Sequence, residues 1–534
     1  HNGLAMILVT AAGGLCSIVI GFLVSRIATG MAQKLRTELF ERVESFALAD
    51  FNKFSTASLI TRSTNDIQQI QMTSILLLRL ALMAPIMAIG GLQKAVHNAP
   101  NLSWIIALAV SVLLVVIAVL FVIAVPRFKK LQTLVDKLNL VTRENLVGLK
   151  VIRAFHNEKI EQKKFQQANA ELNKMNLFVN RLMMLLDPIM TLVMNFSSVA
   201  IVWFGAHLIS SGNLQIGNMM AFLEYAMQVI ISFLLLSMVF IMVPRAAVSV
   251  KRVGEVLDTL PSIVDPPSPQ RLPDDATGKI EFKDVTFTYP DADLPVLSSI
   301  NFTAEPGQTT AFIGSTGSGK STLINLIPRF YDVSAGQILL DGVDIRQLKL
   351  EDLYDQIGYV PQKGVLFSGT IASNIKYGNA KASQKLVEKS AKIAQAAEFI
   401  SELKNGYKND IAQGGSNVSG GQRQRLSIAR AIAVEPNVYI FDDSFSALDF
   451  KTDAKLRLAL AKETKHKTVL IVGQRINTIM NADKIIVLDE GKIVGQGTHQ
   501  ELMKNCEVYQ EIAASQLSED DLQKMSATTA KGAA

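Results

Sequence analysis

The residues best suited to bind a phosphate stand in one short segment, from Gly314 to Ser321. The segment has the sequence GSTGSGKS and fits the pattern GxxxxGK[ST]. Glycines let backbone N–H groups curl around phosphate oxygens, and the N-terminus of a following helix adds favourable dipole charge. Lys320 would neutralise the β- and γ-phosphates, while the Ser321 hydroxyl would ligate Mg²⁺. The segment therefore predicts a nucleotide-binding phosphate loop.

The segments on either side give this loop the structural context that the chemistry requires. Residues 309–313 form an apolar run typical of a strand, and residues 322–327 have the pattern of a helix. A strand, a glycine-rich turn and a helix N-terminus are the parts of a phosphate loop. We expect the following residues to contact the nucleotide: Gly314, Thr316, Gly317, Ser318, Gly319, Lys320, Ser321 and Thr322.

Two further segments carry candidate site residues. Residues 438–441 are four apolar or aromatic residues, and Asp442 and Asp443 follow them. An apolar strand that ends in Asp is the expected form of a strand placing a carboxylate in the Mg²⁺ shell. Upstream, residues 419–422 have the sequence Ser-Gly-Gly-Gln, and we refer to them as the SGGQ segment.

The half of the chain before this region consists of long apolar runs. Of the 534 residues, 53 are Lys or Arg and 47 are Asp or Glu; the mean hydropathy is +0.26. A membrane span takes roughly 20 residues. Five runs approach that length with little charge, which excludes a wholly soluble protein: residues 1–25, 75–92, 102–125, 188–209 and 225–243.

The basic residues between the runs indicate the orientation in the membrane. Residues 26–74 and 127–181 are rich in Lys and Arg, whereas residues 93–101 hold only Lys94 and residues 210–218 hold neither. Basic loops stay on the cytoplasmic side. Membrane topology thus accounts for the basic clusters, and no nucleic-acid partner is expected. The first residue would lie outside; with no initiator Met, this leads us to expect that one N-terminal helix is missing from this chain.

The phosphate loop, the SGGQ segment and the acidic strand, in this order and spacing, resemble the ATPase domain of ATP-binding cassette (ABC) transporters. The preceding spans resemble the exporter subgroup, in which each half-transporter fuses six membrane helices to one ATPase domain. The resemblance implies an α-helical transmembrane domain, with five of six helices present. It also implies an α/β P-loop ATPase domain with a helical subdomain that bears the SGGQ segment. The compact form, without long insertions, favours a bacterial plasma membrane, and the basic segments place the ATPase domain in the cytoplasm.

The resemblance also suggests a division of the chain into four parts. We expect a transmembrane domain with long cytoplasmic helix extensions over residues 1–260 and an ATP-binding cassette domain over residues 278–515. Residues 261–277 hold five of the sixteen prolines and should form an extended linker. Residues 516–534 should be a polar tail. Both cysteines are expected to be free thiols.

Several single residues acquire roles through the resemblance. Tyr289 matches the aromatic residue that stacks on adenine, and Gln362 matches the glutamine that senses Mg²⁺. The Mg²⁺ ligands would then be Ser321, Gln362 and Asp442. In the family, two ATPase domains sandwich ATP and Mg²⁺ between them. The SGGQ segment of one subunit then completes the nucleotide site of its partner. This implies a role at the partner-bound nucleotide for Ser419, Gly420, Gly421 and Gln422.

Two positions depart from the family pattern, and both concern hydrolysis. Asp443 stands where the family usually has the Glu that acts as general base, and Gln474 stands at the switch position usually held by His. An Asp carboxylate sits back by roughly 1.5 Å, and a misplacement of about an ångström can cost on the order of 10²-fold in rate. An amide can bind a γ-phosphate but cannot become cationic.

These departures lead to the hypothesis that the chain is one half of a heterodimeric exporter. Its own phosphate loop would form a degenerate, slowly hydrolysing ATP site, and its SGGQ segment would complete the catalytic site of a partner with intact Glu and His. The chain would then be an ATPase coupled to transport, with hydrolysis mainly at the partner's site. The alternative is a homodimer whose Asp443 and Gln474 suffice for hydrolysis.

The substrate is less constrained. Methionines are abundant in the last two apolar runs, and flexible thioethers can repack around varied apolar ligands. We expect a small hydrophobic or amphipathic substrate, drug-like or lipid-like, exported across the lipid bilayer. A peptide exporter and a regulatory, channel-like protein remain alternatives.

Overall fold

The computed structural model describes residues 2–516, which form two compact units. The helical unit comprises the residues up to Arg42 and Thr56–Asp258. The α/β unit comprises Val43–Ser55 together with the residues from Thr259 onward. Of the polar tail expected over residues 516–534, all but Gln516 lies outside the described residues.

The helical unit is built of long helices joined by short turns. Two π-helical segments, Arg62–Asp66 and Leu77–Ala81, and one 3₁₀ turn, Pro100–Leu102, interrupt or precede them. The α-helices are α1 (Asn2–Glu44), α3 (Thr56–Thr61), α4 (Ile67–Leu76), α5 (Leu82–Asn98), α6 (Ser103–Val147), α7 (Leu149–Ala154), α8 (Glu158–Met184), α9 (Leu186–Ser210) and α10 (Ile216–Asp258).

Five helical stretches among the described residues are long and apolar enough to cross a membrane. They are Gly3–Glu44, Thr56–Asn98, Pro100–Val147, Glu158–Ser210 and Ile216–Leu236. Each overlaps one of the apolar runs identified in the sequence, so the prediction of five spans is confirmed. Most of these stretches exceed the roughly 20 residues of a span, and the helices therefore continue beyond the bilayer.

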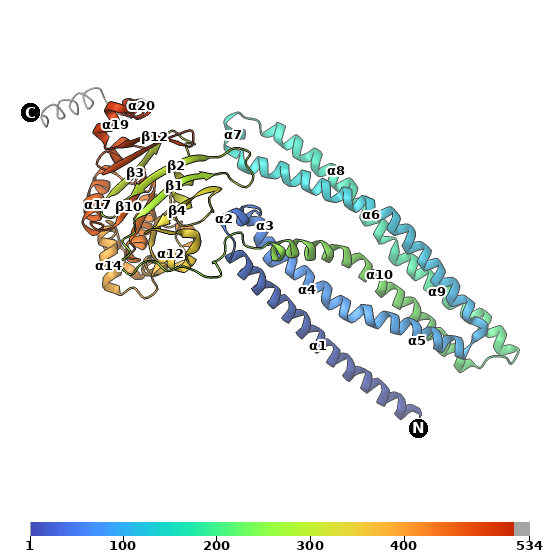
Figure 1. Cartoon of the computed structure of the whole chain (residues 1–534). Helices are drawn as coiled ribbons and strands as arrows, with labels where there is room; N and C mark the ends of the chain where they lie inside the picture. The colour runs from blue at the N-terminus through green and yellow to red at the C-terminus, as the bar shows by residue number, and fades with distance from the viewer. Residues whose placement is uncertain (1, 517–534) are drawn as a thin grey trace, which may run out of the picture. The chain divides into compact units, whose positions relative to one another are not determined.

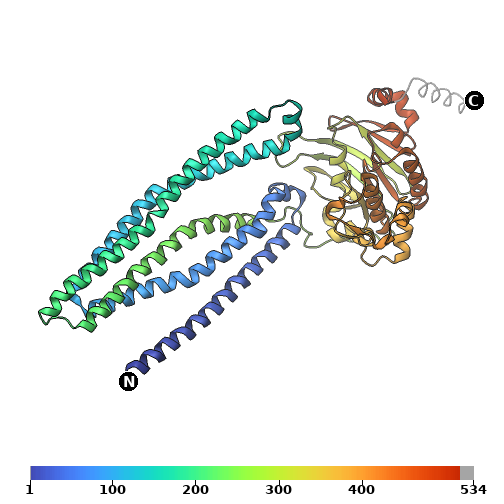
Figure 2. The same cartoon turned by 180° about the vertical axis from the view of Figure 1, so that it is seen from behind.

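The helices of this unit pair in a definite way. Helix α6 runs beside α8 and α9, and α10 runs beside α4 and α5 (Figure 1). Figure 2 shows the same pairing from behind. The α5–α10 contact depends on Gly91, because a Cβ atom there would stand 2.9 Å from Val229 Cγ2. Leu102, Ile201 and Phe222 are buried in the cluster where α6, α9 and α10 meet.

A polar network fastens the cytoplasmic part of α10 to the segment around Asp66. Ser249 Oγ donates to Asp66 Oδ1 at 3.0 Å, and Arg252 pairs with Asp66 Oδ2 at 3.2 Å. Arg62, in the same π-helical segment, pairs with Glu255 at 3.0 Å. Asp66 and Arg62 are buried, so their partners Arg252 and Glu255 compensate charges that water reaches poorly.

The α/β unit contains a six-stranded sheet in the order β12-β11-β3-β10-β9-β6. Neighbouring strands are parallel except β12, which pairs antiparallel with β11. A second, antiparallel sheet has the order β2-β1-β4-β5. The strands are β1 (Ile280–Phe287), β2 (Leu297–Ala304), β3 (Thr309–Gly314), β4 (Ala335–Leu340), β5 (Val343–Asp344), β6 (Ile357–Val360), β9 (Val438–Asp442), β10 (Thr468–Val472), β11 (Lys484–Asp489) and β12 (Lys492–Gly497).

The remaining elements cover these sheets or form a helical subdomain. In the subdomain, helices α13 to α16 enclose their own apolar core, which Tyr439 and Phe441 of β9 join. The elements are α11 (Lys320–Leu326), α12 (Leu350–Asp355), β7 (Gly369–Thr370), α13 (Ile371–Ile375), α14 (Gln384–Ile393), α15 (Ala397–Glu402), β8 (Asp410–Ile411), α16 (Gly420–Ala433), α17 (Phe450–Glu463), α18 (Ile476–Ile479), α19 (His499–Asn505) and α20 (Glu507–Gln516). The SGGQ segment begins α16, as the predicted fold class requires.

The short helix α2 (Leu48–Asn52) belongs to the α/β unit although it follows α1 in the chain. Asp50 is fully buried and accepts hydrogen bonds from Ser262 N at 2.7 Å, Ser262 Oγ at 2.9 Å and Lys53 Nζ at 3.0 Å. Burial acts to raise the pKa of Asp50, but these hydrogen bonds outweigh it and hold the pKa below its usual value. Asn52 Nδ2 lies 3.3 Å from the Tyr331 hydroxyl.

Candidate functional site

The candidate site forms where three parallel strands end. Strand β10 pairs with β3 on one side and with β9 on the other, and Val472 is in register with both Phe312 and Asp442. Because the carboxyl ends of parallel strands meet at one edge of a sheet, the loops that follow them converge there. These loops carry the phosphate-loop residues, the Asp442–Asp443 pair and Gln474.

The phosphate loop has a backbone that glycine alone accommodates without strain. Gly317 and Gly319 have φ angles of 87° and 94°, in the left-handed region that favours glycine. A Cβ atom at Gly319 would also stand 2.7 Å from Leu297 Cδ2, and one at Gly314 would stand 2.0 Å from the Leu488 carbonyl oxygen. The glycines predicted from the sequence therefore shape the loop through both backbone conformation and close packing.

Lys320 folds its ammonium group into this loop. Its Nζ donates to the Gly314 carbonyl at 2.9 Å, to the Ser315 carbonyl at 2.7 Å and to Ser318 Oγ at 3.3 Å. Burial lowers the pKa of Lys320, while the negative charges of Asp443 and Asp442 raise it. The cation thus stands within the loop, where it can meet incoming phosphates.

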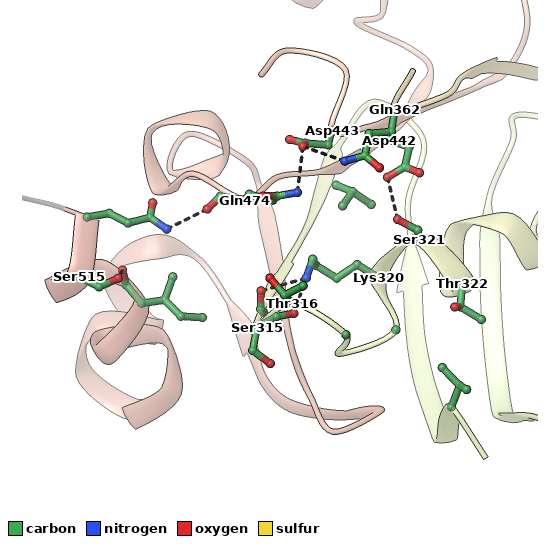
Figure 3. Close-up of a pocket in the computed structure, with 17 residues that line it drawn as sticks. Ser315, Thr316, Lys320, Ser321, Thr322, Gln362, Asp442, Asp443, Gln474 and Ser515 are labelled. Atoms are coloured by element: carbon green, nitrogen blue, oxygen red, sulfur yellow. Dashed lines mark hydrogen bonds between the residues drawn. The ribbon is translucent and has the colours of Figure 1, made fainter. Parts of the chain in front are cut away.

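The residues expected to hold Mg²⁺ lie together. Ser321 Oγ donates to Asp442 Oδ1 at 3.1 Å, and Gln362 lines the same cavity (Figure 3). Burial, and the nearby charge of Asp443, raise the pKa of Asp442, whereas the Ser321 hydrogen bond lowers it. A hydroxyl, one carboxylate and a carbonyl oxygen fit Mg²⁺, which takes few protein ligands and completes its shell with water and phosphate oxygens. When bound there, the ion would neutralise phosphate charge.

Asp443 and Gln474 are in direct contact. Gln474 Nε2 donates to Asp443 Oδ2 at 3.0 Å, and Gln362 Nε2 approaches the same oxygen at 3.5 Å (Figure 3). The backbone of Asp443 is in the left-handed region at φ 44°, and its N–H donates to the Val472 carbonyl at 3.1 Å. Burial raises the pKa of Asp443, and the hydrogen bonds with Gln362 and Ser446 lower it by less, so the pKa stays above its usual value.

The end of helix α20 adds a residue that the sequence did not point to. Gln516 Nε2 donates to the Gln474 carbonyl at 2.8 Å, and Gln516 Oε1 accepts from Ile476 N at 2.9 Å. Its amide therefore holds the backbone on both sides of Arg475. Ser515 and Ile512 of the same helix line the cavity as well. A single glutamine near the end of a helix has no spacing pattern, so sequence reasoning could not identify it.

The cavity enclosed by these loops has a volume of about 560 Å³. It brings together most of the residues predicted from the sequence; Ser318 belongs to the same loop but is buried. The predicted residues that line it are Gly314, Thr316, Gly317, Gly319, Lys320, Ser321, Thr322, Gln362, Asp442, Asp443 and Gln474.

Tyr289 and the SGGQ segment do not line this cavity. The Tyr289 hydroxyl lies 3.0 Å from Thr322 Oγ1, and its ring packs edge-on against Phe287 and Tyr331. Ser419 and Gln422 form a capping box at the start of α16: Gln422 N donates to Ser419 Oγ at 3.2 Å, and Ser419 N donates to Gln422 Oε1 at 2.9 Å. The structure thus brings Tyr289 to Thr322, directly after the phosphate loop, whereas no residue of the SGGQ segment lines the cavity of its own chain.

Comparison with known proteins decides the family. Residues 1–233 match the ABC transporter transmembrane region, and residues 297–446 match the ABC transporter family. The chain is 43% identical over 521 residues to an uncharacterised ABC transporter ATP-binding protein of Mycobacterium bovis, covering 96% of this chain and 88% of that protein. The chain belongs to the ABC transporter family.

Further matches place this ABC transporter among the exporters. It is 33% identical over 528 residues to an ATP-dependent lipid A-core flippase of Syntrophus aciditrophicus, covering 97% of this chain and 86% of the flippase. A solved structure of a bacterial Atm1-family ABC exporter with ATP bound superposes with a TM-score of 0.80 at 26% identity, covering 97% of this chain and 90% of that one.

The expectations of family, fold class and location are thus confirmed. The chain is an exporter-type half-transporter, in which a helical transmembrane domain is followed by an α/β ATPase domain. It is a multi-pass membrane protein whose ATPase domain lies in the cytoplasm. ABC exporters hydrolyse ATP and work as dimers in a membrane, so the protein requires ATP and a second half-transporter.

Proposed function

We propose that this ABC exporter subunit works in a heterodimer that moves hydrophobic or amphipathic compounds across the membrane. Its own phosphate loop binds ATP and Mg²⁺ in a site that hydrolyses slowly. Its SGGQ segment completes the nucleotide site of a homologous partner that has Glu and His at the positions of Asp443 and Gln474. The observation that carries this proposal is the hydrogen bond between Gln474 and Asp443.

This hydrogen bond opposes general-base catalysis. A general base must reach the attacking water with a carboxylate oxygen at about 2.6–3.2 Å. Asp443 is one methylene shorter than Glu, and its Oδ2 accepts from Gln474 at 3.0 Å. Gln474, at the switch position, has an amide side chain, which cannot take up or release a proton near neutral pH. Both substitutions therefore reduce hydrolysis at the same nucleotide.

The rest of the site supports ATP binding. The phosphate loop has its glycines, Lys320 stands within it, and Ser321 and Asp442 lie 3.1 Å apart as a ready pair of Mg²⁺ ligands. A site that binds ATP without rapid hydrolysis would keep the two ATPase domains associated around the bound nucleotide. The other site of the dimer would then supply the hydrolysis that drives transport.

The position of the SGGQ segment supports the second half of the proposal. Ser419 and Gly420 stand at the N-terminus of the 14-residue helix α16, away from the cavity of their own chain. A helix N-terminus favours phosphate through its N–H groups and its dipole. In a head-to-tail pair of ATPase domains, this terminus would meet the nucleotide of the partner subunit.

The proposed substrate class rests on the membrane helices and the relatives. The helical unit carries many exposed apolar side chains, including Phe196, Trp203 and Met220. The relatives of this chain include lipid A-core flippases at 33% identity. A lipid-like or otherwise amphipathic substrate is therefore the best-supported class.

The test is steady-state Mg-ATP hydrolysis by the subunit alone in lipid nanodiscs, with ATP binding measured separately. The expected result is ATP binding with almost no turnover. Lys320→Ala is the matched control, because it should abolish the binding that the wild type retains. Turnover near one per second, roughly the lower end of ordinary enzyme rates, would instead mean a working homodimer.

A further inference from the structure

A basic groove lies between helices α6 and α8 of the helical unit. It encloses a volume of about 670 Å³, and four cationic side chains line it: Arg127, Lys130, Lys174 and Arg181. Two of them come from α6 and two from α8, which pack side by side (Figure 1). The nucleotide site uses none of these residues.

The four cations of this basic groove outnumber its carboxylates, since Glu171 is the one acidic residue among those that line it. Glu171 also lines the groove, but its Oε2 is bound by Lys137 Nζ at 2.8 Å. Among the described residues, the ion pairs of the helical unit include none of the four cations. The groove therefore carries net positive charge, which attracts an anion.

The groove lies at the end of the membrane-spanning segments. Arg127 comes two residues after the uncharged run 102–125, and Arg181 comes just before the apolar residues 182–186. At 1.5 Å rise per residue, Lys130 lies only about one helical turn beyond Arg127. By the distribution of Lys and Arg this is the cytoplasmic side. The cations thus stand at the depth of lipid headgroups.

The floor of the groove is apolar. The guanidinium of Arg127 lies 4.7 Å from the centre of the Phe178 ring. Phe178 and its neighbour Leu177 are 43% and 46% exposed, and Leu134 and Met175 line the same groove. Cations beside exposed apolar side chains suit a ligand with a charged head and a hydrocarbon tail better than a free phosphate ion.

We propose that this basic groove binds the phosphate headgroup of an anionic phospholipid from the cytoplasmic leaflet. Basic pockets between membrane helices on this side are suited to anionic lipid headgroups, since each Lys or Arg near the surface adds to the attraction. The bound lipid would hold α6 against α8 at the membrane surface. This site is separate from the nucleotide site and does not depend on whether the exporter is a heterodimer.

The test compares lipid retention by the full-length protein in detergent, measured by native mass spectrometry with added phosphatidylglycerol or phosphatidylcholine of the same acyl chains. The variant Lys174→Gln/Arg181→Gln removes two charges from exposed positions on the groove side of α8. The matched control Lys159→Gln/Lys163→Gln removes two exposed charges from the same helix, more than two turns away from the groove.

The wild type should retain phosphatidylglycerol in preference to phosphatidylcholine. Lys174→Gln/Arg181→Gln should reduce this preference by about tenfold or more, and the matched control should keep it. Lys130→Gln, on the facing helix α6, should also weaken it, which provides a second route if the double variant unfolds. Equal retention by the groove variants and the wild type, or an equal loss in the control, would overturn the proposal.

Discussion

Gln474 donates a hydrogen bond to Asp443, and the two atoms, Nε2 and Oδ2, are 3.0 Å apart. The two residues follow adjacent parallel strands, β10 and β9, whose ends are held in register by the pairing of Val472 with Asp442. By the resemblance to the family, Asp443 stands where a catalytic Glu is expected and Gln474 stands where the switch His is expected. The two side chains are hydrogen-bond partners, so the two unusual residues form one local structure. Changing one of them to the residue typical of the family leaves the other unusual residue in place.

The single change Asp443→Glu should therefore raise ATP hydrolysis by less than about threefold. The longer side chain regains the reach of a general base, but Gln474 still cannot become cationic at the γ-phosphate. Steady-state hydrolysis in nanodiscs measures the effect. A rise approaching the order of 10²-fold expected from correcting an ångström of misplacement would count against the degenerate site.

The double change Asp443→Glu/Gln474→His should raise hydrolysis by at least about tenfold over the single change. An imidazole restores an ionisable group whose usual pKa is near 6.5, so the gain should depend on pH between about 6 and 8. The same double change combined with Lys320→Ala should show none of the gain. A rise that survives Lys320→Ala would mean that the activity comes from another site.

Stability of the nucleotide-free protein should depend on pH through Asp443. Burial raises its pKa in the folded state, so between the unfolded and the folded pKa values the folded protein binds this proton more strongly than the unfolded chain does. This contribution to stability is complete below the unfolded pKa and is lost as pH rises through the folded value. Asp443→Asn should therefore unfold at a higher temperature than the wild type at pH 8, and the difference should shrink towards pH 4. A difference independent of pH would contradict this origin.

Asp50→Ala should destabilise the α/β unit by about 2–3 kcal/mol. The buried carboxylate accepts three hydrogen bonds, and its loss leaves the Ser262 N–H without its acceptor. Because the pKa of Asp50 is lowered, its contribution is present above the unfolded value near 4 and disappears as pH falls through the folded value. Thermal unfolding of wild type and variant at pH 7 and pH 3 measures both effects. Equal melting temperatures at pH 7 would show that the contact contributes nothing.

Gln516→Leu should loosen the loop that carries Gln474. It removes two hydrogen bonds, each worth about 0.5–1.5 kcal/mol, so the Ile476 amide should exchange with deuterium roughly 5- to 150-fold faster. Gln516→Glu is the matched variant, because it can still accept from Ile476 N but cannot donate to the Gln474 carbonyl. The exchange rate of the Ile476 amide in Gln516→Glu should lie between the rates in the wild type and in Gln516→Leu. Equal exchange rates in all three proteins would show that Gln516 does not hold this loop.

The sequence alone was sufficient to predict the parts of the site that are local in the chain. The phosphate loop is a contiguous pattern between a strand and a helix, and Asp442 directly ends its strand, so spacing was enough. Asp443 and Gln474 were each identified, but their contact spans 31 positions. That contact depends on the order of β9 and β10 in the sheet, which a single sequence does not specify.

Other contacts depend on tertiary packing and have no pattern of their own. Asp50 follows a long helix of the transmembrane domain in the chain, and nothing in its neighbourhood indicates that α2 packs with Ser262, 212 positions later, in the α/β unit. The five spans were predicted from length and apolar character. Which of them pair was not, because the helix-facing and lipid-facing sides are both apolar and give little amphipathic signal.

In the proposed heterodimer, this subunit binds ATP and cleaves it only slowly. The most direct measurement is a single-turnover experiment, in which the subunit in nanodiscs is loaded with radiolabelled Mg-ATP, freed of unbound nucleotide, and quenched at intervals. We predict that the retained nucleotide is still ATP after several minutes, while Lys320→Ala retains none. Conversion of most of the bound ATP to ADP within seconds would contradict the account and show that Asp443 and Gln474 support hydrolysis.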